Sequence, residues 1–306
     1  MNQIPTSLME NVTHGTQKRP MLAISFKSGP KTAYPDHFFV ARHWHENIEM
    51  IKIIEGTYLI EINLEEIRLN PGDLCILNSG ALHQLTGLES VTRHHVFLFN
   101  PAILNFDYPD LMETQLIIPW KNQELTFPHL IRKNAEHYEL FNDYISRLIA
   151  LFFQQEEGWY FRCKLLLLEF LYTLMSKNLL LGENHQPGAA EKERIHRYKK
   201  IVSYMEGHYD QKLTLTELAA QACCSPQYLC RFFKNICGCS PIDYLIQIRL
   251  KQAQKLLIQT TASILDISLS CGFDNVSYFI RKFRQYTGKT PGTYRKDQKN
   301  HNLFID

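Results

Sequence analysis

The chain has 306 residues, of which 45% are apolar and 21% are charged, and its formal net charge is +2. That length accommodates two domains, and that composition excludes a disordered or fibrous protein. The charge is uneven, because residues 1–190 carry 15 basic and 21 acidic side chains whereas residues 191–306 carry 18 and 10. The basic second part is therefore the part that we expect to meet a polyanion.

Neither a secretory signal nor a membrane-spanning helix is predicted. Residues 1–20 lack a basic start followed by an apolar run. The most apolar stretch, 163–175, is interrupted by Lys164 and Glu169, short of the roughly 18 uninterrupted apolar residues of a membrane helix. We expect a cytoplasmic protein with no membrane partner, whose eight cysteines are reduced thiols. The cysteines between Cys223 and Cys239 lack paired C-x2-C spacing, so no metal is expected there.

Residues 21–105 are predicted to form strands. Short apolar runs alternate with turn-forming residues: the runs include Met50–Ile54, Tyr58–Ile62 and Leu74–Leu77, and the turns include Glu55-Gly56 and Asn70-Pro71-Gly72-Asp73. Strands at this spacing indicate a small β-barrel or sandwich.

Residues 134–182 are predicted to be helical, because apolar residues recur there at helical spacing. The second run, Arg162–Leu181, has apolar residues on more than one face, which is typical of a helix that is deeply buried or shared with a second subunit. Residues 162–181 are therefore a candidate homodimer interface. Residues 186–194 are polar and rich in structure breakers, and we expect them to link a domain at 21–185 to a domain at 195–297.

An internal repeat marks the basic part. Residues 228–234 recur at 278–284, and Gly238–Pro241 recurs at Gly288–Pro291, in both cases 50 residues later. A repeat of this length indicates that one supersecondary unit occurs twice.

Each copy is predicted to form a helix, a tight turn and a second helix. In the first, at about 215–237, Thr214 and Glu217 fit a capping box and Ser225 can cap the second helix. In the second, at about 264–287, Gly272 supplies the turn and Asn275 the cap. Residues 241–258 between them would span about 27 Å as a helix, comparable with the roughly 34 Å of one DNA turn.

The second helix of each copy has two faces. The apolar face of the first copy consists of Leu229, Phe232, Phe233 and Ile236. The outward faces carry Gln227, Cys230, Arg231 and Lys234 in the first copy and Ser277, Ile280, Arg281 and Arg284 in the second. Arg231 and Arg281 can each present a fork to guanine in the major groove, and Lys234 and Arg284 are placed to meet phosphates. The alternative is that these are solvated charges on surface helices.

Ile195–Lys296 resembles the DNA-binding domain of the AraC family of bacterial regulators. The resemblance is carried by Gly272-Phe273, Ser277-Tyr278-Phe279, Arg281-Lys282-Phe283, Gly288-Lys289-Thr290-Pro291 and Tyr294-Arg295. It implies two helix-turn-helix units that read an asymmetric site, and activation through RNA polymerase. The family's base-reading positions fall on Gln227, Cys230, Arg231, Ser277 and Arg281, and Cys230 departs from the more usual polar residue.

The first domain contains a pattern similar to the two cupin motifs. His43-Trp44-His45-x3-Glu49-x6-Gly56 resembles the first, and Gly72-x5-Asn78-Ser79-Gly80-x2-His83 resembles the second, with Asn78 where proline is usual. In cupin enzymes the equivalents of His43, His45, Glu49 and His83 hold a metal ion, and these donors suit Fe, Mn, Ni or Zn.

The same pattern is also similar to the sensor domain of many AraC-family regulators, whose barrel binds a small effector. His43, Trp44, His45, Glu49 and His83 would then line an effector pocket, with Trp44 either stacking on a sugar-like ligand or belonging to the core. A purely structural role for these residues is a third interpretation. The effector pocket is the interpretation that we favour here, with no metal and no cofactor.

These patterns together predict an α+β protein of two domains: an N-terminal cupin-like β-barrel with a helical extension and a C-terminal all-α domain with two helix-turn-helix units. The expected function is that of a small-molecule-responsive transcription regulator that binds double-stranded DNA and is not an enzyme, and the family resemblance implies that it is an activator that contacts RNA polymerase. A sugar is one candidate effector. The alternatives are a metal-dependent cupin enzyme fused to a DNA-binding domain, and a repressor without an effector.

Overall fold

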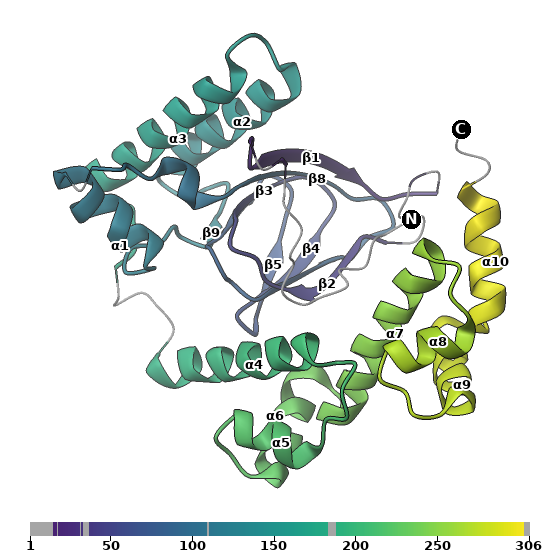
Figure 1. Ribbon diagram of the computed structural model, residues 1–306. Coiled ribbons are helices and arrows are strands. Elements are labelled where there is room, and N and C mark those ends of the chain that lie inside the picture. The colour runs from purple at the N-terminus through teal and green to yellow at the C-terminus, as the bar shows by residue number, and fades with distance from the viewer. Residues whose placement is uncertain are drawn as a thin grey trace. The chain divides into compact units, whose positions relative to one another are not determined.

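The computed structural model describes residues 15–16, 18–30, 32, 37–108, 110–182 and 188–302. They divide into two compact units, with the boundary between Ala190 and Glu191. Figure 1 shows strands in the first unit and helices alone in the second. None of the helices in the described ranges has the length and apolar character that crossing a membrane requires.

The first unit is built on two antiparallel sheets. The strands are β1 Met21–Lys27, β2 Phe39–His43, β3 Ile48–Glu55, β4 Tyr58–Ile62, β5 Glu65–Leu69, β6 Leu74–Leu77, β7 His83–Gly87, β8 Arg93–Phe99 and β9 Leu130–Ile131. One sheet has the strand order β1-β8-β3-β6-β9, and the other has the order β2-β7-β4-β5. The predicted β-rich first domain is confirmed as this pair of sheets, whereas β9, only two residues long, carries no strand pattern in the sequence.

Along the central strands, successive side chains point to opposite faces of the sheet and belong to two separate apolar cores. On β3, Ile51 and Ile53 face the core between the two sheets, and Ile48 and Met50 face the opposite side. Because successive strand residues point to opposite faces, Glu49 shares the inner face with Ile51. A carboxylate is therefore directed into the space between the sheets.

Helices cover the outer face of the five-stranded sheet (Figure 1). The main ones are α2 Tyr138–Gln154 and α3 Trp159–Ser176, and they follow the short elements η1 Pro101–Leu104, η2 Glu113–Ile117 and α1 Ile118–Lys121. The predicted helical stretch 134–182 thus contains two helices. The chain reverses between them through Gln155 and Gly158, both at positive φ.

The second unit contains seven helices within its described residues. They are α4 Ala189–Gly207, α5 Leu215–Gln221, α6 Pro226–Cys237, α7 Pro241–Gln259, α8 Ile264–Ser270, α9 Val276–Thr287 and α10 Pro291–Asn302. The predicted caps are confirmed: Thr214 and Glu217 form a capping box, and Ser225 and Asn275 accept hydrogen bonds from the backbone N–H groups three residues later.

Helix α4 begins inside the stretch 186–194, where the sequence analysis placed a linker, so the linker is shorter than expected. Its first turns are rich in Glu, Lys and Arg, which favour helix, and Glu193 pairs with Arg197 one turn later at 3.1 Å. Residues 186 and 187 lie outside the described residues.

Each helix-turn-helix copy has its own aromatic core. In the first, Phe233 of α6 packs between Tyr198 of α4 and Tyr244 of α7, with ring centroids 5.8 and 5.6 Å apart. In the second, Phe283 of α9 packs against Tyr294 of α10 at 5.5 Å. The two repeats therefore hold their second helices by equivalent contacts.

Candidate functional site

The second helix of each repeat, α6 or α9, separates buried from exposed side chains along its length. On α6, Leu229, Phe232, Phe233 and Ile236 are buried, as predicted. The outward side chains lie where the sequence placed them: Gln227, Arg231, Lys234, Ser277, Arg281 and Arg284 are exposed and Cys230 is half-buried. The repeat therefore presents two outward faces, one on each helix.

The exposed cations of these faces are not used to hold the fold. Within the described part of the chain, no ion pair or side-chain hydrogen bond engages Arg231, Lys234, Arg281 or Arg284. Arg281 lies over the ring of Tyr278, 5.3 Å from its centroid, which supports the guanidinium from one side. These cations remain available for a polyanionic partner.

Two other arginines of the same unit serve the fold instead. Arg249 on α7 donates to the carbonyl oxygens of Tyr209 and Gln211, both at 2.7 Å. Arg295 on α10 donates to the carbonyl oxygens of Leu257 and Ala262. Neither role could be predicted from the sequence, because backbone carbonyl partners leave no pattern in it.

A surface hollow lies beside α9. It is lined by Ser277, Ile280, Arg281, Arg284, Gln285 and Thr290. Gln285, four residues after Arg281 on α9, and Thr290, beyond the end of that helix, are lining residues that were not predicted from the sequence. The hollow mixes two cations with hydroxyl and amide groups, a surface suited to phosphates and base edges.

In the first unit, three histidines and one carboxylate lie together although they come from separate segments. His43 ends β2, His45 lies in the following turn, Glu49 is on β3 and His83 begins β7. Within the described residues, the group His43, His45 and His83 is the one whose donor atoms lie close enough to share an ion, all within 4.8 Å. The carboxylate Oε2 of Glu49 lies 3.1 Å from Nε2 of His45 and 3.5 Å from Nε2 of His83.

A bulge in β2 directs His43 into this cluster. Val40 pairs with Leu85 and His43 pairs with His83, so three steps along β2 match two steps along β7. The additional residue changes the face on which the rest of the strand lies, a common role of bulges next to sites. Arg42 then forms a two-pronged ion pair with Glu61 of β4, at 2.6 and 2.7 Å.

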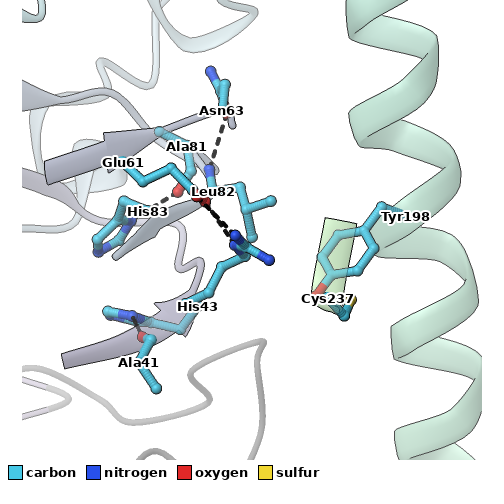
Figure 2. A network of polar contacts seen from close by, with 10 residues as sticks. Ala41, His43, Glu61, Asn63, Ala81, Leu82, His83, Tyr198 and Cys237 are labelled. Atoms are coloured by element: carbon cyan, nitrogen blue, oxygen red, sulfur yellow. Dashed lines mark hydrogen bonds and ion pairs between the residues drawn. The ribbon is translucent and has the colours of Figure 1, made fainter. Parts of the chain in front are cut away.

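Each of the three imidazole rings is held by a hydrogen bond between its Nδ1 and a backbone carbonyl oxygen. Nδ1 of His43 lies 2.9 Å from the carbonyl oxygen of Ala41, and Nδ1 of His83 lies 2.8 Å from that of Ala81 (Figure 2). Nδ1 of His45 lies 3.1 Å from the carbonyl oxygen of Asn47. Because a carbonyl oxygen only accepts, each of these bonds places a hydrogen on Nδ1, so a ring that also donates from Nε2 to Glu49 carries both hydrogens.

Burial and mutual charge perturb the cluster. Burial raises the pKa of Glu49, but the hydrogen bonds and charges of His45 and His83 outweigh it and hold the pKa well below its usual value. Burial, together with the charge of His43, lowers the pKa of His83 to about 4, although Glu49 opposes the shift. The carboxylate is therefore ionised at neutral pH.

Two further residues of the cupin-like pattern contribute to the structure around the cluster. Trp44 is only 4% exposed, which is typical of a core residue. Asn78, which stands where proline is usual, exchanges two hydrogen bonds of 2.9 Å with the backbone of Phe127. Its amide thus ties the loop before β7 to the segment before β9.

Comparison with known proteins gives a match for each unit. Residues 29–158 match the model of an AraC-like ligand binding domain, and residues 218–297 match that of a helix-turn-helix domain. Together the two matches span more than half of the chain.

Three relatives match along most of their length. The chain is 28% identical to the uncharacterized HTH-type transcriptional regulator YdeC of Bacillus subtilis, covering 84% of this chain and 87% of that protein. It is 25% identical to the melibiose operon regulatory protein of Escherichia coli, covering 85% of both. It is 23% identical to the HTH-type transcriptional activator RhaS of Klebsiella pneumoniae, covering 87% of this chain and 89% of that protein.

Proposed function

Because this chain belongs to the AraC family of transcription regulators, with a ligand-binding unit and a DNA-binding unit, we propose that it reads an asymmetric DNA site with α6 and α9 and activates transcription when a small molecule occupies its first unit. The observation that carries the proposal is the pair of outward faces, which are equivalent in position but different in composition. Gln227 and Cys230 of α6 correspond to Ser277 and Ile280 of α9. Two different readers in one chain favour a site without a palindrome.

Each outward face combines a base reader with a phosphate contact. Arg231 and Arg281 are exposed at equivalent positions, and an arginine fork matches the two acceptors on the major-groove edge of guanine. Lys234 and Arg284 lie one turn later, where a helix leaves the groove and meets the backbone. Gln227, Cys230 and Ser277 lie on the same outward faces, where they would contact the base pairs next to those guanines.

Activation and the effector class are proposed from the relatives. RhaS is named as an activator, which favours activation, and with it a contact to RNA polymerase, over repression. The melibiose operon regulatory protein suggests a sugar as one class of effector. The effector site that we propose is the buried group of His43, Trp44, His45, Glu49 and His83.

The first unit is also proposed to form a homodimer through 162–181. Helix α3 buries one face against α2, yet Leu165 and Tyr172 within this range are each at least half exposed. Large exposed apolar side chains on one helix favour a partner surface.

The test is selection of binding sites from random DNA with the full chain, followed by footprinting. We expect one preferred site with two unlike halves about 10 base pairs apart, and affinity that falls steeply with salt. The matched control inverts one half of the selected site and leaves the other unchanged. Equal binding to every sequence, or enrichment of a palindrome, would overturn the proposal.

A further inference from the structure

We propose that Tyr278 is a positioning residue for DNA recognition, because its ring holds the guanidinium of Arg281 toward the base edges. Its counterpart in the first repeat, Tyr228, is engaged by Arg197 and gives no such support to Arg231. The inference rests on the proposed function, since it concerns how the outward faces read DNA. It adds that the half of the site at α9 is read more strictly than the half at α6.

The two tyrosines occupy the same place in the repeat. Tyr228 is the third residue of α6, and Tyr278 is the third residue of α9. Each lies three positions before the arginine of its outward face, so in both repeats the two side chains are neighbours on the helix surface. A difference between the two arginines therefore comes from what surrounds each ring, since the spacing along the chain is the same.

The ring of Tyr278 is approached by cations of its own helix. The guanidinium carbon of Arg281 lies 5.3 Å from the ring centroid, and Nζ of Lys282 lies 5.8 Å from it. The face of an aromatic ring attracts a cation within about 6 Å. Tyr278 is itself half-buried, and its ring packs against Phe273 with centroids 6.3 Å apart. Arg281 thus lies on a ring that the core of the second repeat holds in place.

The ring of Tyr228 is engaged by another helix. Arg197 of α4 lies over it, 5.7 Å from the centroid, and donates a hydrogen bond of 3.2 Å to the Tyr228 hydroxyl. Glu193, one turn earlier on α4, pairs with Arg197 at 3.1 Å, and Phe232 stacks on the same tyrosine ring. Among the residues that the structure describes, no aromatic ring lies within cation–π distance of Arg231.

Tyr278 lies on the side of Arg281 where bases are read. Side chains of an α-helix lean toward the N-terminus of their helix, and Tyr278 lies one turn before Arg281 in that direction. When a recognition helix enters the major groove, its N-terminal residues contact the base edges. A guanidinium held over Tyr278 is therefore held toward the end of α9 that we expect to enter the groove.

Holding the arginine before binding has a measurable effect on base preference. Immobilising a long side chain at an interface weakens binding by roughly two- to tenfold, and a side chain that is already held avoids part of this loss. The gain applies to guanine, because guanine offers both acceptors that the arginine fork requires. From the strength of an exposed cation–π contact, we expect Tyr278 to raise the preference for guanine at the Arg281 position by about two- to fivefold.

Packing is the competing role of Tyr278. A ring that only fills space beside Phe273 would affect the stability of the second repeat, and through it the fraction of chains that bind DNA. The ratio of the affinities for two DNA sites does not depend on this fraction, because both sites are titrated with the same preparation. The experiment therefore measures base preference instead of affinity alone.

The experiment uses the full chain and the selected DNA site, with guanine changed to adenine at the position where Arg231→Ala or Arg281→Ala relaxes the preference. Tyr278→Leu is expected to lower the preference for guanine at the Arg281 position about two- to fivefold. Tyr278→Phe, which retains the ring, is expected to keep that preference. The matched control is Tyr228→Leu, which removes the equivalent ring and should leave the preference at the Arg231 position unchanged. An unchanged preference in Tyr278→Leu, or an equal loss in Tyr228→Leu, would overturn the inference.

A second measurement requires neither a variant nor DNA. NMR relaxation of the arginine Nε–H groups in the free chain is expected to give a higher order parameter for Arg281 than for Arg231. Equal order parameters would contradict the inference, also where Tyr278→Leu does not fold.

The two measurements also separate this inference from the proposed function. A chain that has no preferred DNA site contradicts the proposed function, and the order parameters then decide whether Tyr278 holds Arg281. A preferred site that is weakened by Arg281→Ala and indifferent to Tyr278→Leu contradicts the positioning role and leaves the proposed function intact.

Discussion

His43 of β2 and His83 of β7 are direct partners across an antiparallel pair, and their ring centroids lie 4.1 Å apart. The β2 bulge creates this relationship. Val40 already faces the inner core, so strict alternation along the strand would direct His43 outward and Arg42 inward. With the additional residue, His43 faces inward, and Arg42 reaches Glu61 instead of carrying an unpaired charge into the core.

The base-reading arginines give the first prediction. Arg231→Ala and Arg281→Ala are each expected to weaken binding to the preferred site by about 1–3 kcal/mol and to relax the preference at one position, each in a different half of the site. Lys234→Ala is expected to weaken binding to all sequences alike and to lower the salt dependence by about one counterion. Measured affinities for single-base variants of the site, at several salt concentrations, distinguish the two roles.

Lys121→Ala, which removes an exposed cation from the end of α1, is the control for the change in charge and should leave DNA binding unchanged. Unaltered affinity and base preference in both arginine variants would contradict the assignment of the outward faces.

The turns of the two repeats give a second prediction, because equivalent positions hold different residues. Cys223 adopts φ +52° and Gly272 adopts φ +76°. A left-handed conformation costs a residue with a side chain about 1–2 kcal/mol, and glycine recovers part of this at the expense of chain entropy. Cys223→Gly, at an exposed position, is expected to stabilise the first repeat by about 0.5–1 kcal/mol, measured by hydrogen exchange of α5 and α6.

Gly272→Ala is the converse substitution, because it removes glycine from the equivalent turn of the second repeat. An added Cβ would lie 2.6 Å from the carbonyl oxygen of Tyr209, so this variant is expected to destabilise the second repeat by more than 1 kcal/mol. If Cys223→Gly lowers the stability of the first repeat and Gly272→Ala leaves that of the second unchanged, the two turns do not carry this backbone strain.

The helix-turn-helix repeats could be predicted from the sequence because their signals are local. Thr214, Ser225 and Asn275 cap helices through residues three positions away, and the repeat itself aligns the two outward faces. The histidine cluster could be predicted only as a set of residue types. Its geometry depends on the register of β2 against β7 and on three backbone carbonyls, and neither leaves a pattern in the sequence.

The exposed face of α3 gives a third prediction. If residues 162–181 pair with a second copy, the full chain is expected to sediment as a dimer at micromolar concentration, and Leu165→Glu should shift it to monomer, since Leu165 is 50% exposed. Glu169→Gln is the control, because it changes a residue of the same helix without adding a charge to the proposed interface. A wild-type chain that sediments as a monomer would exclude this interface.

Buried His94 gives the last prediction, a dependence of stability on pH. Its Nδ1 lies 2.8 Å from the hydroxyl of Tyr58, and its ring stacks on Phe26 with centroids 5.0 Å apart. Burial lowers the pKa of His94 to about 3, with Glu49 opposing the shift and His95 adding to it. In the unfolded chain the pKa is about 6.5, so between these values the unfolded state binds a proton that the folded state does not. The contribution of His94 to the free energy of unfolding therefore falls as pH falls below about 6.5.

At pH 5 this loss amounts to about 2 kcal/mol relative to pH 7. The chain's three tryptophans, Trp44, Trp120 and Trp159, all lie in the first unit, so urea unfolding followed by tryptophan fluorescence reports on that unit alone. His94→Gln keeps a polar group opposite Tyr58 but does not titrate. Between pH 7 and pH 5, the free energy of unfolding of this variant should therefore fall by about 2 kcal/mol less than that of the wild type. Because the other titrating groups are common to both proteins, the difference between the two curves isolates His94, and parallel curves would show that its ring is not held neutral by burial.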